Sequence, residues 1–316
     1  MTSQQFNLLC ERIKGIIVLT SLGISLTSSP KNKKTKFKAI RTPLRFPGGK
    51  SRAVSEILEL FPKFKEYREP MVGGGSIFLS TKFAFPKKKY WINDINHDLY
   101  SFWQVCKETP ELLAKEAYNI KNSEKNGKEI FYEWRYPITP LTDFELALRY
   151  FVLNRISFSG LVDAGGFSKE SFERRFTKSS IEKIIYTGKE LESVKVSNFS
   201  YETLLKEKGD NVFIYLDPPY YGNQDSKLYG LRGYLHTTFN HKRLAEELEN
   251  CKFNWLLTYD DDKVIRKYYS FANKIEKELS YGMNNVASDK ATKGKELFIS
   301  NYTPKRQEEL KLEIKN

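Results

Sequence analysis

The stretch Asn211-Val212-Phe213-Ile214-Tyr215-Leu216-Asp217-Pro218-Pro219-Tyr220 decides the fold of this chain. Its β-branched and aromatic residues predict a buried strand that ends at an acid. Proline cannot donate to a strand ladder, so the two prolines fix an extended turn just beyond the strand. In an open α/β sheet, ligands bind beyond the carboxyl ends of the strands. The stretch therefore predicts an α/β fold with a functional site at Asp217, Pro218, Pro219 and Tyr220.

The Asp-Pro-Pro-Tyr sequence resembles the catalytic motif of methyltransferases that act on exocyclic amines of nucleic-acid bases. Such an amine is a poor nucleophile because its lone pair is delocalised into the ring. The resemblance implies that the Asp217 carboxylate and the Pro218 carbonyl accept the two N–H bonds, so that the lone pair can attack a methyl donor. Tyr220 would stack on the extruded base. Because short motifs recur by chance, a plain turn with a surface tyrosine is the alternative.

Composition narrows the class of protein. The chain has 316 residues, of which 40% are hydrophobic and 14% aromatic, and its net charge is +13. This length suffices for one large domain and a smaller inserted one, and the hydrophobic content excludes a disordered chain. The positive charge favours nucleic acid as the partner. The cysteines and histidines show no Cys-x-x-Cys pair and no metal-ligand spacing, so we expect no metal, no disulfide framework and a cytoplasmic location.

Residues 15–26 form the one long apolar run, and they follow Arg12 and Lys14. A secretory signal peptide is therefore an alternative to consider. The run is too short and too rich in serine and threonine for a membrane span, and no cleavage site of the Ala-x-Ala kind follows. We expect no membrane association and a flexible basic extension over residues 1–41.

A first glycine turn lies at Phe46-Pro47-Gly48-Gly49-Lys50-Ser51. The apolar spacing of residues 54–61 predicts a helix after it, which Ser51 can cap. Glycines before a helix let backbone amides approach an anion, and Lys50 adds charge; a simple turn and cap is the alternative. A phosphate loop of nucleotide triphosphatases is excluded because Leu44 stands where that motif needs glycine.

A second glycine turn, Gly73-Gly74-Gly75-Ser76, follows a predicted strand over residues 67–72 and precedes an apolar helix. The dinucleotide fingerprint is incomplete because Phe78 replaces its third glycine, which favours S-adenosylmethionine over a nicotinamide cofactor. The next strand, residues 90–93, ends in Asp94. An acid at that position is suited to bind ribose hydroxyls.

Taken in order, these motifs resemble the Dam-type DNA N6-adenine methyltransferases of the alpha group, over roughly residues 42–302. In that group the cofactor motifs come first, a recognition segment lies in the middle and the catalytic motif comes last. The chain departs from the family at Met71, where an aromatic residue is common, and at Gly74 in the turn. The resemblance implies S-adenosyl-L-methionine as cofactor. It implies these cofactor-binding residues: Phe46, Gly48, Gly49, Lys50, Glu69, Pro70, Gly73, Gly75, Asp94 and Asp217.

A long segment between Asp94 and the catalytic strand exceeds what an α/β core needs. Residues 99–120 predict a helix interrupted at Pro110, and Thr142 to Glu145 predict a capping box at the start of another. The following Asn-Arg segment is similar to one in the family, and a basic run comes after it, for which an exposed, solvated helix is the alternative. It does not closely match the hairpin of members that methylate GATC, so the target sequence stays open. We expect DNA contacts from Asn154, Arg155, Ser159, Lys169, Arg174, Arg175 and Lys178.

The remaining chain completes the predicted sheet. Asn240 is expected to cap a helix through Leu248, and residues 253–259 predict a strand. Residues 275–281 and 296–302 predict a hairpin. The acids of residues 260–262 are interpreted as a capping cluster rather than a metal site. A loop over residues 221–236, with Tyr221, Tyr229 and Tyr234, either closes over DNA or is an ordinary surface loop.

The predicted fold class is therefore a doubly wound, mostly parallel sheet with helices on both faces and a largely helical inserted domain. The methyltransferase domain takes residues 42–98 and 194–304, the target-recognition domain residues 99–193, and a charged tail residues 305–316.

The predicted activity is methyl transfer from S-adenosylmethionine to N6 of a flipped adenine in double-stranded DNA. The enzyme is expected to be a monomer that serves restriction-modification or genome marking, with a separate cognate endonuclease as one partner left open. N4-cytosine methylation is disfavoured because serine is usual at position 217 for that target. Methylation of RNA or protein glutamine would more often place asparagine there. A non-catalytic DNA-binding protein of the same fold is the alternative from another class.

Overall fold

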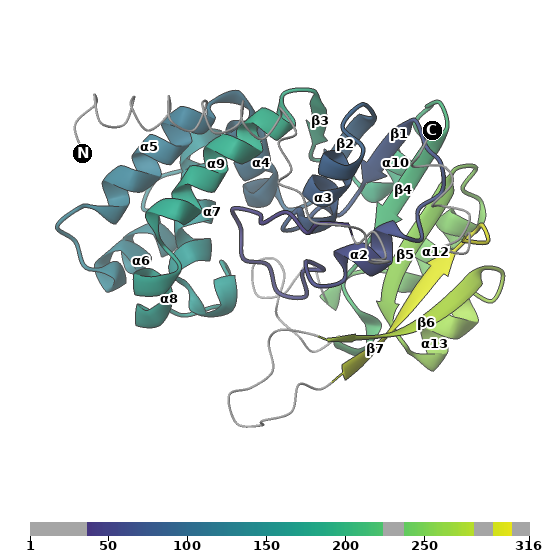
Figure 1. Cartoon of the computed structure of the whole chain (residues 1–316). Helices are drawn as coiled ribbons and strands as arrows, with labels where there is room; N and C mark the ends of the chain where they lie inside the picture. The colour runs from purple at the N-terminus through teal and green to yellow at the C-terminus, as the bar shows by residue number, and fades with distance from the viewer. Residues whose placement is uncertain (1–36, 224–236, 281–292, 305–316) are drawn as a thin grey trace, which may run out of the picture.

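The structure is a computed structural model that describes residues 37–223, 237–280 and 293–304. Expectations for residues 1–36, for Tyr229 and Tyr234 and for the tail over 305–316 fall outside these ranges. One seven-stranded sheet runs in the order β3-β2-β1-β4-β5-β7-β6 (Figure 1). Its strands are β1 (Glu66–Glu69), β2 (Lys89–Asn93), β3 (Val194–Ser197), β4 (Val212–Leu216), β5 (Asn254–Asp260), β6 (Asn273–Ser280) and β7 (Lys293–Ser300).

The first five strands are parallel, and the β6–β7 hairpin adds two antiparallel strands beyond β5. This arrangement confirms the predicted doubly wound, mostly parallel sheet. β4 lies in the middle, between β1 and β5. The strand order reverses at β1 and β4, and the crevice at such a switch point is where doubly wound sheets bind ligands.

β4 is buried along its whole length because each of its two faces meets a separate apolar core. Phe213 and Tyr215 belong to one core, whereas Ile214 and Leu216 belong to the other. This alternation follows from the two-residue period of a strand. The chain leaves the core at Asp217, so that the acid is the first residue beyond the buried strand.

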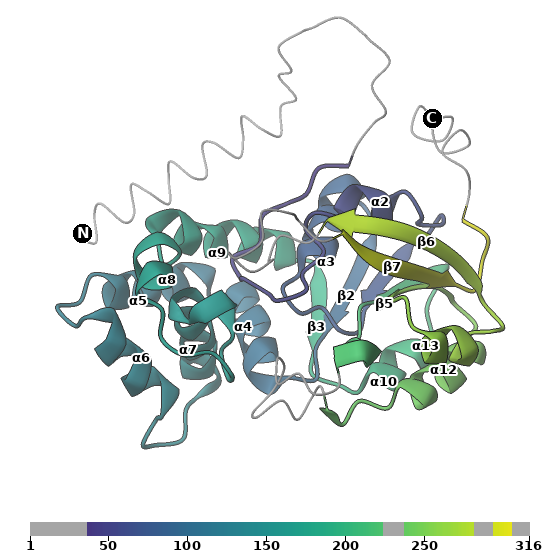
Figure 2. The same cartoon turned by 90° about the horizontal axis from the view of Figure 1, so that it is seen from below.

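Helices cover both faces of the sheet, as Figure 2 shows. One face carries α2 (Val54–Leu58) and α3 (Ser76–Ala84), and the other carries α10 (Tyr201–Lys206), α12 (His241–Glu249) and α13 (Lys263–Tyr268). The remaining helices lie together at one side of the sheet, on the left of Figures 1 and 2. They are α4 (His97–Glu108), α5 (Pro110–Lys121), α6 (Gly127–Arg135), α7 (Asp143–Ile156), α8 (Lys169–Arg174) and α9 (Lys178–Leu191).

The helical side is joined to the sheet through α4, which packs against both β3 and α7. The predicted break at Pro110 is confirmed, because α4 ends at Glu108 and α5 begins at the proline. The capping box of Thr142 and Glu145 is also confirmed at the start of α7. The sequence thus marked the boundary between α4 and α5 and the start of α7 correctly.

At other helix starts the outcomes differ. Ser51 was expected to cap, but α2 begins only at Val54 and follows Ala53 without a side-chain cap, because residues 51–53 form a turn. The cap at Asn240 is confirmed by its bond from the Arg243 amide. Asp262 caps α13, as expected for the acidic cluster. Among the described residues, no helix combines the length and apolar character needed to cross a membrane.

Candidate active site

A cavity of about 600 Å³ opens at the carboxyl ends of β1, β2 and β4. Glu69 ends β1, Asp94 follows β2 and Asp217 follows β4, so parallel pairing brings the three acids to one edge of the sheet. The cavity is lined by every residue that the sequence predicted for cofactor binding and catalysis. Residues far apart in the chain therefore share one site.

The second glycine turn packs against the ring of Phe46 from the first one. A Cβ atom added at Gly74 would lie 2.5 Å from the Cβ atom of Phe46, and one at Gly73 would lie 2.8 Å from its ring. Gly75 has a φ of 69° and leaves no space for a Cβ beside Trp103. Only glycine permits this close approach, which explains the departure at Gly74.

Asp94 is fixed by the backbone around it. Its carboxylate accepts hydrogen bonds from the amides of Gly73 and Asn96, each at 3.0 Å. Burial raises the pKa of Asp94 to about 6, and these backbone donors oppose the shift. The acid is therefore oriented toward the cavity by the same turn that packs on Phe46.

Glu69 is nearly fully buried, and its Oε2 accepts the hydroxyl of Tyr67 at 2.5 Å. Burial raises the pKa of Glu69 well above its usual range, and the nearby charges of Asp217 and Asp94 add to the increase. Three carboxyl groups, those of Glu69, Asp94 and Asp217, therefore line the same cavity. Such a site suits a ligand that carries positive charge.

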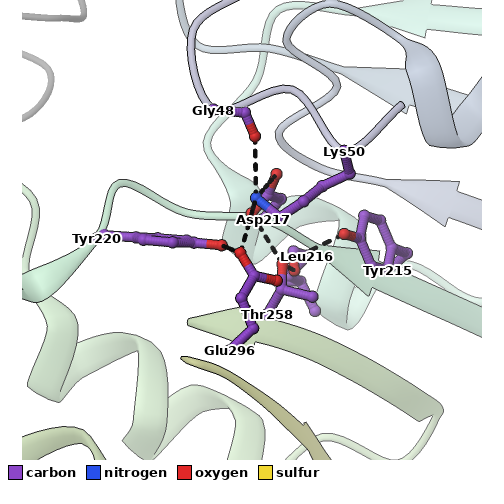
Figure 3. Close-up of polar contacts among 8 residues, drawn as sticks. All are labelled: Gly48, Lys50, Tyr215, Leu216, Asp217, Tyr220, Thr258 and Glu296. Atoms are coloured by element: carbon purple, nitrogen blue, oxygen red, sulfur yellow. Dashed lines mark hydrogen bonds and ion pairs between the residues drawn. The ribbon is translucent and has the colours of Figure 1, made fainter. Parts of the chain in front are cut away.

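The carboxylate of Asp217 is held by two donors (Figure 3). The Lys50 ammonium lies 2.9 Å from Oδ1 and 3.0 Å from Oδ2. The Thr258 hydroxyl donates to Oδ1 at 2.8 Å. Lys50 is only 3% exposed whereas the Asp217 side chain is 22% exposed, so the buried lysine presents a carboxylate that still faces the cavity.

Tyr220 is also held from two directions. Its hydroxyl donates to Oε1 of Glu296 at 2.5 Å, and the Lys50 ammonium lies 4.7 Å from the centre of its ring (Figure 3). Glu296 lies on β7, and the sequence did not predict it as a site residue. The one signal for it is an acid that immediately precedes the apolar run of residues 297–299.

The sequence also did not predict a second group of residues that line the cavity. It comes from the chain after β3 and from the start of α12, and it includes Phe199, Tyr201, Phe239 and Arg243. These residues belong to no local motif. Folding alone brings them opposite the glycine turns.

Two predicted DNA contacts are contradicted. Asn154 is fully buried, and its side chain bonds the backbone of Arg45 and of Gly160. Arg155 is 7% exposed and donates to the carbonyls of Pro43 and Arg175. Their polar groups join the first glycine segment, which is residues 42–51, to the helical side, so neither side chain reaches the surface to contact DNA.

The other predicted DNA contacts lie at the surface. Ser159 is half-buried with a φ of 55°, beside the cavity-lining Gly160 and the 65% exposed Phe158. Four basic residues in or next to α8 and at the start of α9 are exposed: Lys169, Arg174, Arg175 and Lys178. Within α8, Lys169 pairs with Glu173, and Arg174 pairs with Glu170.

A cluster of cations lies where the first glycine segment meets α7, α8 and α9. Burial lowers the pKa of Arg155 to about 9, and the charges of Arg45 and Arg175 lower it further. Burial and the charge of Arg175 lower the pKa of Arg45, while Glu170 opposes the shift. Burial, Arg155 and Arg41 lower the pKa of Lys183. The mutual repulsion shows that positive charge is concentrated here, and Arg41 and Arg175 are its exposed members.

Comparisons with known proteins identify the family of the chain. Residues 46–283 match the family model described as D12 class N6 adenine-specific DNA methyltransferase. The chain is similar to the Type II methyltransferase M1.LlaDCHI of Lactococcus lactis subsp. cremoris, with 26% identity over 83% of this chain and 96% of the relative. It is similar to the Type II methyltransferase M.MjaIII of Methanocaldococcus jannaschii, with 27% identity over 82% of this chain and 98% of the relative.

The chain is also similar to the DNA adenine methylase of Vibrio cholerae, with 31% identity over 57% of this chain and 65% of the relative. The family match spans both glycine turns, the helical side and the Asp-Pro-Pro-Tyr sequence. The resemblance seen in the sequence is thereby confirmed, together with the predicted class of activity. The chain belongs to the D12 class of N6 adenine-specific DNA methyltransferases.

Proposed function

We propose that this enzyme binds S-adenosyl-L-methionine in the cavity and methylates an adenine held by Asp217, Pro218, Pro219 and Tyr220. The observation that carries the proposal is the Asp217 carboxylate, which Lys50 and Thr258 hold in the same cavity as both glycine turns. A fixed acceptor beside a ligand cavity is the arrangement that transfer to an amine requires.

The residues around the turns fit the cofactor. The turn at Gly73 and Gly74 has no room for a Cβ, so a ligand can approach its backbone closely. Asp94 would accept ribose hydroxyls, and the carboxyl groups of Glu69 and Asp217 suit a ligand with ammonium and sulfonium charges. When bound, S-adenosylmethionine supplies an electrophilic methyl group. The residues that would hold it are Phe46, Gly48, Gly49, Lys50, Glu69, Pro70, Gly73, Gly75, Asp94 and Asp217.

The target amine is activated by hydrogen bonding. A carboxylate is acceptor-only, so Asp217 can accept one N–H bond of the adenine N6 while the Pro218 carbonyl accepts the other. Both bonds would favour a more tetrahedral nitrogen, whose lone pair leaves the ring plane and points toward the methyl group. Transfer would form the N6–CH3 bond as the S–CH3 bond of the sulfonium breaks, with the neutral thioether as leaving group, and N6 would then release one proton. Tyr220 presents its ring to the plane of the base.

Target adenine in a duplex must first leave the base stack, at a cost of a few kcal/mol. Contacts with DNA phosphates can offset that cost. The net charge of +13 and the cluster around Arg45 and Arg175 support such contacts. We assign phosphate contacts to the exposed Lys169, Arg174, Arg175 and Lys178, and a contact at the cavity rim to Ser159.

We further propose that residues 99–193 form the target-recognition domain of a cytoplasmic monomer. Residues 42–98 and 194–304 form the catalytic domain. The relatives named Type II methyltransferases favour a role in restriction-modification, with a cognate endonuclease acting separately. The relative named DNA adenine methylase favours genome marking.

The test is to incubate the purified protein with labelled S-adenosylmethionine and unmethylated genomic DNA, and to map modified bases by single-molecule sequencing. N6-methyladenine in one short motif is expected. Transfer to cytosine or RNA would overturn the assigned substrate. Asp217→Ala is expected to abolish transfer and keep DNA affinity, because the substitution removes the acceptor and leaves the cation cluster intact. Persistent transfer by this variant would overturn the assigned mechanism.

A further inference from the structure

A buried acid on the last strand adjoins the proposed reaction centre. Glu296 is 1% exposed and precedes the buried Leu297, Phe298 and Ile299 on β7. Burying a carboxylate among apolar residues is costly unless its charge and its oxygens are matched. An apolar residue would serve the strand better, so Glu296 needs an explanation other than packing.

The contacts of Glu296 point into the reaction centre (Figure 3). Its Oε1 accepts the Tyr220 hydroxyl at 2.5 Å and lies 3.7 Å from the Lys50 ammonium. Its Oε2 is buried without a hydrogen-bond partner among the residues that the structure describes. Lys50 also pairs with both oxygens of Asp217, so the ammonium lies between two carboxylates.

We propose that Glu296 is a positioning residue for methyl transfer, because it fixes Tyr220 relative to Asp217. The inference rests on the proposed function, in which Asp217 and Tyr220 contact the target adenine. Glu296 anchors the Tyr220 ring at its hydroxyl, and the ammonium that it shares with Asp217 lies against the ring face. Glu296 thus fixes both Tyr220, whose ring would lie against the base, and Asp217, which would accept an N6 hydrogen bond.

The charge of Glu296 adds to this positioning. With Glu296 ionised, Lys50, Asp217 and Glu296 together carry one negative charge. A net negative site stabilises positive charge as it moves from sulfonium to amine during transfer. Protonated Glu296 removes that charge, so the ionised form is the active one.

Several charged and titratable groups face Glu296. One of them is Lys50, from the first glycine segment. Three more come from β4 and the turn after it: Tyr215, Asp217 and Tyr220. The last two are the register partners of Glu296 on the neighbouring strands, Asp260 on β5 and Lys277 on β6. Burial raises the pKa of Glu296 to about 7, Lys50 opposes the shift and Asp217 adds to it. Glu296 therefore changes charge within the pH range in which the enzyme can be assayed.

The experiment compares Glu296→Gln with Tyr220→Phe in single-turnover methyl transfer between about pH 6 and pH 9. Glutamine keeps an acceptor for the tyrosine hydroxyl and removes the charge, whereas phenylalanine keeps the ring and removes the hydroxyl. The wild-type rate is expected to rise with pH through about 7. The Gln variant is expected to lose this rise and to be about tenfold slower at the plateau, since charged hydrogen bonds are worth that much. The KM for DNA is expected to stay unchanged.

Glu276→Gln is the matched control, since Glu276 lies on the same hairpin but is exposed and pairs with Arg266. Its pH profile is expected to match that of the wild type. Tyr220→Phe is expected to slow transfer without raising the KM for DNA, and it also serves if the Gln variant fails to fold. An unchanged rate in Tyr220→Phe, or a wild-type pH profile in Glu296→Gln, would overturn the inference.

Thermal unfolding separates positioning from a structural role. A raised pKa means that between about pH 4.5 and pH 7 the native state binds more protons than the unfolded state, so stability falls as pH rises through this window and stays lower above it. Glu296→Gln is therefore expected to melt at a higher temperature than the wild type at about pH 8. A lower melting temperature together with weaker DNA binding would assign Glu296 to structure alone. Failure of the proposed function is distinguishable, because the wild type would then transfer no methyl group to adenine, or Asp217→Ala would retain transfer.

Discussion

The Lys50 ammonium pairs with both carboxylate oxygens of Asp217, at 2.9 and 3.0 Å, across a sequence separation of 167 residues. Lys50 follows a pair of glycines, a sequence that elsewhere serves phosphate binding. Here the buried lysine donates to the Gly48 carbonyl and to an acid at the end of β4. The first glycine segment therefore orients the proposed acceptor of the target amine.

Replacement of Lys50 by methionine is expected to slow methyl transfer by about a hundredfold, because displacement of a reacting group by about 1 Å costs that much. Glu296 would also lose its cation inside the protein, so we expect a loss of roughly 1–3 kcal/mol in the free energy of unfolding. The loss is expected to shrink below pH 7, where Glu296 is protonated. Urea unfolding and single-turnover kinetics measure the two effects.

Lys65→Met is the control for that variant. Lys65 pairs with Asp210, and both side chains are highly exposed, so the change is expected to stay within about 0.5 kcal/mol. Equal effects at Lys50 and Lys65 would contradict a special role for the buried lysine.

Gly74→Ala is expected to weaken cofactor affinity by about tenfold or more. The new Cβ would come within 2.5 Å of the Cβ atom of Phe46, so the turn and the segment that carries Phe46 must move apart. Calorimetric titration with S-adenosylmethionine measures the effect. Gly166→Ala is the control, because nothing lies within 4 Å of a Cβ there. Unaltered affinity in Gly74→Ala would show that the cofactor does not depend on this turn.

Features carried by short stretches of sequence could be predicted. β4, both glycine turns and Asp94 follow from runs of a few residues whose chemistry is local, and parallel pairing then brings them to one edge. Ser51 failed as a cap because a turn separates it from the helix start, which side-chain preference does not reveal.

Features that depend on contacts between distant segments could not be predicted. Glu296 reaches the site because β7 inserts between β5 and β6. Asn154 and Arg155 were expected to contact DNA on the strength of a family segment, but their side chains satisfy backbone groups of the first glycine segment and of Arg175. Polar residues at the end of a helix look alike in sequence whether they bind a ligand or bind the chain itself.

Cofactor binding without DNA is expected to weaken below about pH 6. Burial raises the pKa of Asp94 to about 6, so the acid protonates there and loses an acceptor for the ribose hydroxyls. Affinity falls toward low pH because only the ionised carboxylate of Asp94 accepts hydrogen bonds on both of its oxygens. Titrations with S-adenosylmethionine between about pH 5 and pH 8 would show this loss, and Asp94→Asn is expected to bind weakly at every pH. A pH-independent affinity in the wild type would contradict the ribose assignment.

Replacement by alanine is expected to lower stability at Arg155 and to weaken DNA binding at Arg175. Arg155 is buried and satisfies the carbonyls of Pro43 and Arg175, so its removal is expected to lower the free energy of unfolding by about 3 kcal/mol. Arg175 is exposed beside Arg45, so its removal is expected to leave stability nearly unchanged and to weaken DNA binding. Removing one phosphate-binding side chain reduces the slope of log affinity against log salt by about one.

Urea unfolding and DNA titrations at several salt concentrations distinguish the two variants. Lys189→Ala, on the last turn of α9, is a control that removes a positive charge outside the cluster around Arg45. It is expected to change the salt slope less than Arg175→Ala does, because a specific phosphate contact requires close approach rather than net charge alone. Equal slopes for the two variants would mean that the cluster attracts DNA only through the overall field, and the assignment of Arg175 to a phosphate would then be wrong.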